Sequence, residues 1–242
     1  MLHAIDQNKA GRNFHSDEGH WREVFKTSED SLTSSVFERL FYLPVELFWK
    51  IFISACNGNS LPEVAGKIDY FEFWPHWSVS DDGENSNFVE PDLFIRFKTF
   101  DLIIESKRWD RKQQRQEQWK EEISAYKKEY EEDARNVYFI ALGGIHHDSS
   151  EKIEGVEVIK CRWKNLLNRV KDAETKLALT SDIIHSNAAI SRILEDIISA
   201  FRIHGFSTGK WFDSFHVDSL RLTTHFEDHL KNLNSEGLYG HT

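Results

Sequence analysis

The order of helical and β-prone patterns along the chain predicts an α/β fold, with a mixed central sheet flanked by helices and a helical extension at the C-terminal end. Two observations support this prediction. Apolar segments with strand periodicity alternate with helical segments through the first part of the chain, and the remainder is mainly helical in pattern. Hydrophobic residues make up 40% of the 242 positions and only 4 are Pro, as expected of a chain that buries a substantial core.

The chain contains no internal repeat and no long Gly/Ser-rich or Pro-rich linker. We therefore expect one folded domain with appended segments. These parts are a polar N-terminal arm over residues 1–27, a core over residues 28–170, and a helical C-terminal extension over residues 171–242 that packs on the core.

The first core helix is predicted to begin at Ser28, because an acceptor side chain and the acids that follow it favour a helix N-terminus. At 100° per residue, the apolar side chains of this helix fall within about 60° of Glu29, whereas Glu38 falls on the opposite side. These apolar side chains are Leu32, Val36 and Leu40. An inward carboxylate is costly unless it meets a cation or hydrogen-bond donors, so Glu29 is the better functional candidate.

The strands are expected to begin with an aromatic, β-prone segment at residues 68–79. A turn-rich acidic stretch at residues 80–87 then suits a hairpin loop. Residues 92–98 and 100–107 are two further strand candidates with a very short connection between them.

The strand candidate at residues 100–107 places two charged side chains on the same face. Side chains alternate along a strand, so Ile103, Glu105 and Lys107 are expected on one face and Ser106 on the other. A charged pair on the solvent face of an edge strand is the alternative interpretation. The strongly apolar start of the segment favours a central strand instead.

The remaining elements are predicted from periodicity and apolar runs. We expect a helix at residues 111–133, strands at 136–142 and 156–161, and helices at 163–170, 183–203 and 219–233. The helix at 111–133 contains seven acids between residues 117 and 133, so we expect it to face solvent except along its aromatic stripe.

The formal charge of -10 argues against non-specific binding of nucleic acid by a generally basic surface. Positive charge nevertheless gathers in residues 107–115, which contain five basic residues and one acid. Such a stretch either contacts phosphates beside an active site or forms a solvated helix face. The candidate phosphate-binding residues are Arg108, Arg111, Lys112 and Arg115.

Cys56 and Cys161 are the only cysteines, so no disulfide framework is expected and a reducing cytoplasm is the predicted location. The beginning of the chain lacks the pattern of a secretory signal. The most apolar stretch, residues 40–56, is interrupted by Pro44 and by charges, and is too short to span a bilayer comfortably. We interpret it as a pair of core helices or a helix and a turn.

Two acids and a lysine provide the candidate chemistry. Hydrolysis of a phosphodiester requires a hard cation that polarises the phosphate, and such cations bind carboxylate oxygens. A neighbouring lysine stabilises the developing negative charge. If residues 92–98 pair with residues 100–107, the side chains of Asp92, Glu105 and Lys107 come together.

The segments Glu90-Pro91-Asp92 and Glu105-Ser106-Lys107 resemble the signature of the PD-(D/E)XK nuclease superfamily, which includes many restriction and repair endonucleases. The common core of that superfamily is a helix, three strands, a second helix and a further strand, similar to the pattern of residues 28–142. The resemblance implies a restriction-endonuclease-like fold for this part of the chain. It does not cover residues 143–242.

The resemblance also implies roles for individual residues. Asp92 and Glu105 would be metal ligands, joined by the backbone carbonyl of Ser106, and Lys107 would be the catalytic lysine. Glu29 matches the acid that many members add from the first core helix, and Gln118 matches a polar residue that some members add from the next helix. The implied cofactor is Mg²⁺, or Mn²⁺ in its place.

The function expected from these residues is a metal-dependent nuclease, a DNA endonuclease with RNA as another possible substrate. Restriction or phage defence is the context that the superfamily suggests. One alternative is a binding subunit that keeps the nuclease fold and acts within a larger defence complex; another is an unrelated α/β protein with a chance motif. A homodimer is plausible, because cutting two strands often requires two active sites.

Overall fold

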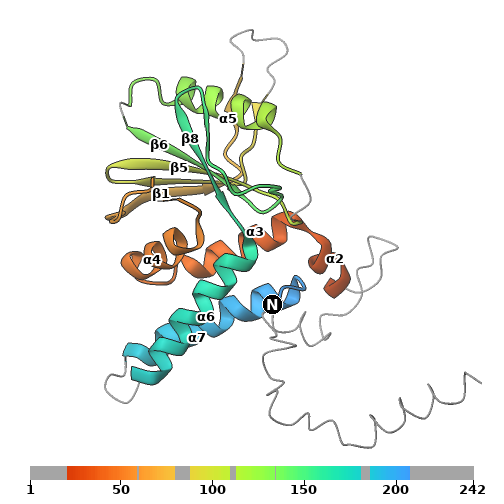
Figure 1. Cartoon of the computed structure of the whole chain (residues 1–242), viewed down its shortest axis with the longest axis vertical. Helices are drawn as coiled ribbons and strands as arrows, with labels where there is room; N and C mark the ends of the chain where they lie inside the picture. Colours follow the sequence, from red (N-terminus) through yellow and green to blue (C-terminus); the bar gives the residue numbers. More distant parts are fainter. Residues whose placement is uncertain are drawn as a thin grey trace, which may run out of the picture. The chain divides into compact units, whose positions relative to one another are not determined.

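A six-stranded mixed sheet forms the centre of the structure, which is a computed structural model (Figure 1). It describes residues 21–58, 60–79, 88–109, 113–133, 135–180 and 186–207. The strands, in their order across the sheet, are β1 (Ile68–Phe73), β4 (Leu93–Phe97), β5 (Phe100–Ser106), β6 (Asn136–Leu142), β8 (Val156–Cys161) and β7 (Glu151–Ile153). A separate two-stranded ladder pairs β2 (Trp77–Ser78) with β3 (Phe88–Val89).

Strand β5 lies in the middle of the sheet, paired antiparallel with β4 and parallel with β6. All seven of its residues are buried. A strand covered on both faces is expected to be a continuous apolar run, and the sequence from Phe100 to Ile104 has that character. The prediction of a central strand is therefore confirmed, and the edge-strand interpretation is wrong.

Helix α5 (Gln116–Glu129) covers one face of the sheet (Figure 1). Its buried side chains recur at spacings of three and four, so one side of the helix meets the strands. Trp119 and Ile123 belong to the same buried cluster as Ile103 of β5 and Phe139 of β6. This packing fixes which face of β5 lies beneath the helix.

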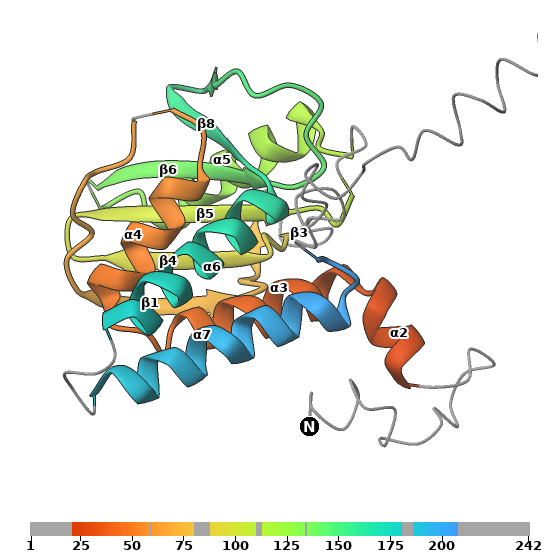
Figure 2. The ribbon, with the colours of Figure 1, turned by 60° about the horizontal axis from the view of Figure 1, so that its bottom comes forward.

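Four helices cover the opposite face of the sheet (Figure 2). They are α3 (Glu29–Leu40), α4 (Val45–Ala55), α6 (Trp163–Thr180) and α7 (Ser186–Ile203). Residues 40–56 thus form the end of α3, a turn at Pro44 and the apolar helix α4, as expected. The α/β class, with a mixed sheet flanked by helices, is confirmed.

Several element boundaries differ from the sequence prediction, and two of these differences lie at the expected ends of the core. Residues Trp21–Thr27, expected to belong to a loose arm, form the short helix α2, whose residues contact α3 and α7. Helix α6 continues to Thr180, so the expected boundary after residue 170 falls inside a helix. The cause is the apolar stripe of α6, which runs on through Ala173 and Leu177 against the core. The expected loop at residues 80–87 and helix at residues 219–233 lie outside the described residues.

None of the helices in the described ranges is both long and apolar enough to cross a membrane. Cys56 and Cys161 are free thiols that face each other in an isolated antiparallel bridge. A hydrogen bond to Cys161, together with burial, raises the pKa of the Cys56 thiol.

Candidate functional site

The end of β5 brings Asp92 and Glu105 together. Leu93 of β4 lies opposite Ile104 of β5, and the same register places Asp92 beside Glu105 where the two strands end. Both acids are buried, with 7% and 2% of their surfaces exposed. Asp92 accepts hydrogen bonds from the backbone N–H of Ser106 at 2.7 Å and from its hydroxyl at 2.8 Å. Ser106 thus contacts Asp92 directly and holds its carboxylate against the end of β5.

Lys107 follows directly after β5 and joins two acids from different elements. Its ammonium group donates to Glu105 Oε1 and to Glu29 Oε1, the latter at 3.3 Å. Glu29 is the first residue of α3, after the N-cap Ser28, and its second oxygen accepts from the backbone N–H of Arg108 at 2.7 Å. Glu38 is exposed on the same helix. The structure therefore places Glu29, and not Glu38, beside Lys107.

Gln118 brings α5 into the same cluster. Its side-chain nitrogen donates to Glu105 Oε1 at 2.7 Å and to Glu122 Oε1 at 2.9 Å. Five predicted residues, from α3, β5, α5 and the segments that precede β4 and follow β5, thus gather at one end of the sheet. These residues are Glu29, Asp92, Glu105, Lys107 and Gln118.

Glu122 is a member of this cluster that the sequence analysis missed. It is 1% exposed, one turn beyond Gln118 on the side of α5 that faces the sheet. The acidic composition of α5 had indicated a solvent-facing helix, and for Glu122 that expectation is wrong. The signal was available in its spacing, because Glu122 lies three residues after Trp119 and four before Tyr126, on the aromatic stripe.

Two glycines at the end of β6 hold the backbone of Lys107 in place. The Lys107 N–H donates to the Leu142 carbonyl at 2.7 Å, and its own carbonyl accepts from Trp163 Nε1 at 3.1 Å. Gly143 and Gly144 have φ of +67° and +65°, and a Cβ on Gly143 would lie 2.0 Å from the Lys107 carbonyl oxygen. Only glycine fits this close approach.

Gln114 adds a second support that the sequence analysis missed. Its side-chain nitrogen donates to the Glu105 carbonyl at 3.0 Å and to the Gly143 carbonyl at 3.2 Å, and its oxygen accepts from Trp119 Nε1 at 2.6 Å. It lies in a run of Gln and basic residues, in which no local pattern distinguishes it from Gln113 or Gln116. Its role depends on contacts that only the fold creates.

Burial and crowding of like charges raise the pKa values of the carboxyl groups. Burial, reinforced by the charge of Glu105, raises the pKa of Asp92 to about 7. Burial also raises the pKa of Glu105, although the charge of Lys107 opposes this effect. For Glu122, burial raises the pKa well above its usual value, and the charge of Glu105 raises it further.

The pKa of Lys107 is raised as well, which for a lysine favours the charged form. Burial alone would lower its pKa, but the charge of Glu105, the hydrogen bond to that residue and the charge of Glu29 together raise it. The ammonium group therefore stays protonated at neutral pH. In this state it can stabilise negative charge but cannot accept a proton.

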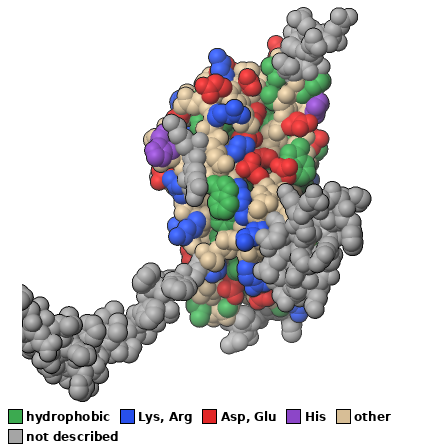
Figure 3. Space-filling view, turned by 90° about the vertical axis from the view of Figure 1, so that its right-hand side faces the viewer, with side chains coloured by type: hydrophobic (Ala, Val, Ile, Leu, Met, Phe, Trp, Pro, Cys, Tyr) green, Lys and Arg blue, Asp and Glu red, His purple; other side chains and the backbone are tan. Residues whose placement is uncertain are grey.

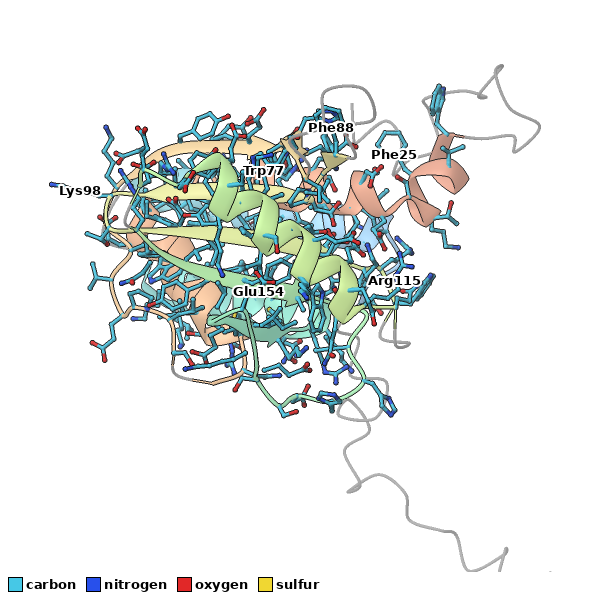
Figure 4. The ribbon with its side chains drawn as sticks, turned by 90° about the horizontal axis from the view of Figure 1, so that it is seen from above. Phe25, Trp77, Phe88, Lys98, Arg115 and Glu154 are labelled. Carbon is cyan, nitrogen blue, oxygen red and sulfur yellow. The ribbon has the colours of Figure 1, made fainter. Side chains whose placement is uncertain are left out.

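The predicted phosphate-binding residues divide into three cases. Arg115 is exposed at the start of α5, as labelled in Figure 4. Arg108 is only 5% exposed, with its guanidinium over the rings of Trp109 and Phe206, and its expected contact with phosphate stays a prediction. A count of basic residues does not reveal which of them packs against aromatic neighbours. Arg111 and Lys112 lie outside the described residues.

Acidic and basic side chains are intermixed on the face of the molecule shown in Figure 3. Among the described residues, no group of three or more His, Cys, Asp or Glu side chains is placed to hold a metal ion as it stands. The carboxylates instead turn toward neighbouring donors, namely Lys107, Ser106 and Gln118. The donor set itself fits a hard cation, because it offers buried carboxylate oxygens, one of which, Glu122 Oε2, has no hydrogen-bond partner.

No protein-family model matches the chain, and no solved structure gives a significant match. Comparison with curated proteins gives a relative in Pasteurella multocida (strain Pm70), the uncharacterized protein PM0110. The two sequences are 31% identical over 236 residues, which cover 88% of this chain and 84% of the relative. On the basis of this identity and coverage, the chain belongs to the same family as PM0110.

Proposed function

We propose that this protein is a metal-dependent nuclease that hydrolyses phosphodiester bonds in DNA with Mg²⁺ or Mn²⁺. The observation that carries the proposal is the meeting of Asp92, Glu105 and Lys107 at one buried strand end, with Glu29 and Gln118 contacting the same groups. The order α3, β1, β4, β5, α5, β6 is also similar to the core of the PD-(D/E)XK superfamily, apart from α4 between α3 and β1 and the β2–β3 ladder between β1 and β4. The fold analogy supports the proposal, but the residues of the site carry it.

Each residue has a distinct task in this proposal. Asp92 and Glu105 would hold the cation, which, when bound, polarises the phosphate and lowers the pKa of a water. Lys107 presents a fixed positive charge to the phosphoryl oxygens as negative charge develops on them. Glu29 and Gln118 keep Lys107 and Glu105 in position through the hydrogen bonds described above.

The proposal is tested by incubating the full chain with supercoiled plasmid, single-stranded DNA and RNA in Mg²⁺ or Mn²⁺. Wild type is compared with Asp92→Asn and Lys107→Met, and with Lys98→Met as a matched control. Lys98 is exposed in the β4–β5 turn, far along β5 from the site, as labelled in Figure 4. We expect cleavage by wild type and Lys98→Met, and a loss on the order of 100-fold in the other two variants.

Cleavage that stays equal in wild type, Asp92→Asn and Lys107→Met would refute the site. Absence of cleavage on every substrate would refute an autonomous nuclease. It would favour a second function, in which the same fold binds nucleic acid as a subunit of a larger complex. The net charge of -10 favours dependence on such a partner, because an acidic chain binds nucleic acid weakly by itself.

A further inference from the structure

Two tryptophans flank the end of β5 at which Asp92, Glu105 and Lys107 meet. Trp74 follows β1, and its backbone N–H donates to the Asp92 carbonyl at 3.3 Å. Trp109 lies two residues beyond Lys107. Only β4 separates β1 from β5, and neighbouring strands are about 4.8 Å apart, so the backbone of Trp74 lies about 10 Å from the end of β5. Both tryptophans therefore border the candidate site.

These two indoles are more exposed than those of the other described tryptophans. Trp74 is 40% exposed and Trp109 is 52% exposed. Trp21 is half-buried. The remaining tryptophans of the described segments are buried in the two apolar clusters: Trp49, Trp77, Trp119 and Trp163. Tryptophan is enriched where a protein surface binds a partner, so two exposed indoles beside one site indicate a binding surface.

Local contacts hold both rings in place. The ring of Phe73 lies against that of Trp74, with a distance of 5.5 Å between the ring centroids. The guanidinium of Arg108 lies over the Trp109 ring, 4.7 Å from its centroid. The backbone N–H of Trp109 also donates to Gln113 Oε1 at 3.1 Å. A ring that is already held loses little conformational freedom when a ligand stacks on it.

The backbone of Trp74 is strained. Its φ is +52°, in the left-handed region, where an L side chain is unfavourable. The following residue is Pro75, and a residue before proline favours extended backbone, so the local sequence does not explain this conformation. Such strain persists only where the surrounding structure enforces it, and it is common in segments that bind ligands. The fold therefore accepts a cost to place this indole beside Asp92.

The shape of the rings and the chemistry beside them indicate the ligand. Flat aromatic rings stack on nucleobases, and the adjacent site acts on a phosphodiester in the proposed function. In a duplex the faces of each base are covered by its neighbours, whereas an unpaired base leaves its faces free. Stacking needs no positive charge, so it suits a chain with a formal charge of -10.

We propose that Trp74 and Trp109 stack on unpaired nucleobases on either side of the scissile phosphate, so that the substrate class is single-stranded nucleic acid. This inference rests on the proposed function, because the phosphodiester site is where the strand is held. Trp74 holds a base beside Asp92, and Trp109 holds a base beyond Lys107. A fully paired strand offers no free base face to either ring.

The test is the binding of short fluorescein-labelled strands to the full chain in EDTA, measured by fluorescence anisotropy. A DNA strand of mixed sequence, an RNA strand of the same sequence and the corresponding DNA duplex are compared. Trp74→Leu and Trp109→Leu remove the flat rings, whereas Trp74→Phe and Trp109→Phe keep a ring. Tyr42→Leu is the matched control, because Tyr42 is 71% exposed beyond the far end of α3, about 18 Å along the helix from Glu29.

We expect each Leu variant to bind the single strand about tenfold more weakly than wild type, because one base stack is lost. The Phe variants and Tyr42→Leu should stay within about threefold of wild type, since both rings remain. Wild type should bind the duplex at least about tenfold more weakly than the single strand. The DNA and RNA strands distinguish which of the two supplies the bases.

The outcomes separate this inference from the proposed function. Wild-type affinity in both Leu variants, a duplex bound as tightly as the single strand, or equal losses in the Leu and Phe variants would overturn the stacking role. Metal-dependent cleavage through Asp92 and Lys107 would still leave the nuclease function standing. Ring-dependent binding of single strands without any cleavage in Mg²⁺ or Mn²⁺ would refute the nuclease and leave the stacking surface standing.

Discussion

At the scale of single residues, the site combines positions that local patterns reveal with positions that they do not. Asp92, Glu105 and Lys107 are predictable because strand alternation and the short connection between β4 and β5 fix their relative places. Glu29 is predictable from the helical stripe that it shares with Leu32. Glu122 could have been found from its spacing on the aromatic stripe of α5, whereas the role of Gln114, which precedes α5, depends on contacts that only the fold creates.

His204 provides a test at this scale that does not involve the acidic cluster. It is 1% exposed, its Nε2 lies 3.2 Å from the Ser35 hydroxyl, and burial together with the charge of Arg108 lowers its pKa to about 4. The folded state therefore resists protonation of His204. Below the unfolded pKa of about 6.5, the unfolded chain takes up the proton first, so stability is lost as pH falls from about 6.5 to 4.

We expect His204 to account for a loss of up to about 3 kcal/mol over this pH range. His204→Gln cannot take up this proton, so its free energy of unfolding should depend less steeply on pH between 6.5 and 4. Urea unfolding followed by circular dichroism at several pH values measures the slope. Equal slopes in the two proteins would show that His204 does not titrate as stated.

At the scale of elements, the turn after β6, the residues just before α5 and the start of α6 act together on the segment that follows β5. Gly143 approaches the Lys107 carbonyl, Gln114 bridges Glu105 and Gly143, and Trp163 at the start of α6 donates to Lys107. The segment that carries Lys107 is therefore held by the backbone of a parallel neighbour and by two side chains. Strain introduced at the turn should be transmitted to the site.

Gly143→Ala tests this connection against Gly66→Ala. Both glycines have positive φ, +67° and +71°, but a Cβ on Gly66 meets no atom within 4 Å. We expect Gly66→Ala to cost about 1 kcal/mol of stability, and Gly143→Ala at least about 2 kcal/mol more, because its methyl group collides with backbone. Chemical unfolding measures both costs.

Under the proposed function, Gly143→Ala should also lose nuclease activity at temperatures where it remains folded, whereas Gly66→Ala should retain it. This result would show that the position of Lys107 depends on the turn at Gly143. Similar unfolding free energies for the two variants would contradict the close approach of Gly143 to the Lys107 carbonyl.

At the scale of the whole molecule, the two sides of the sheet contribute differently. Among the described elements, α5 covers one face together with Trp77 of β2, whereas α3, α4, α6 and α7 bury the larger apolar cluster on the other. Both sides contribute to the site, Glu29 from α3 and Gln118 from α5. The bounds of β6 and β8 agree with the sequence prediction, since continuous apolar runs are local signals. The core boundary that was predicted after residue 170 falls inside α6, which continues as one helix, and the burial of α7 arises from long-range packing that local patterns do not show.

Truncation of the chain tests this organisation. A chain ending after residue 170 loses α7, whose Leu194, Ile197 and Phe201 are completely buried. Each such side chain contributes about 2 kcal/mol by burial, so the three together approach the whole stability of a typical domain. We expect this chain to bind a hydrophobic dye and to melt without a cooperative transition.

A chain that ends after Ser207 keeps every described element and should melt cooperatively, near the full-length temperature. Dye binding and circular dichroism melts compare the two truncated chains with the full chain. A cooperative transition in the shorter chain would show that α7 is dispensable for the core.

The hydrogen bond from Trp163 to the Lys107 carbonyl affects when the site can form during synthesis of the chain. Synthesis proceeds from the N-terminus, so Glu29 leaves the ribosome long before β5. Strand β5 in turn leaves the ribosome before Trp163, whose indole binds the carbonyl of Lys107. A growing chain therefore cannot complete this constellation until α6 has begun to emerge. If the site cuts DNA or RNA, its assembly is delayed until most of the polypeptide exists, which keeps nascent chains from damaging nucleic acid around them.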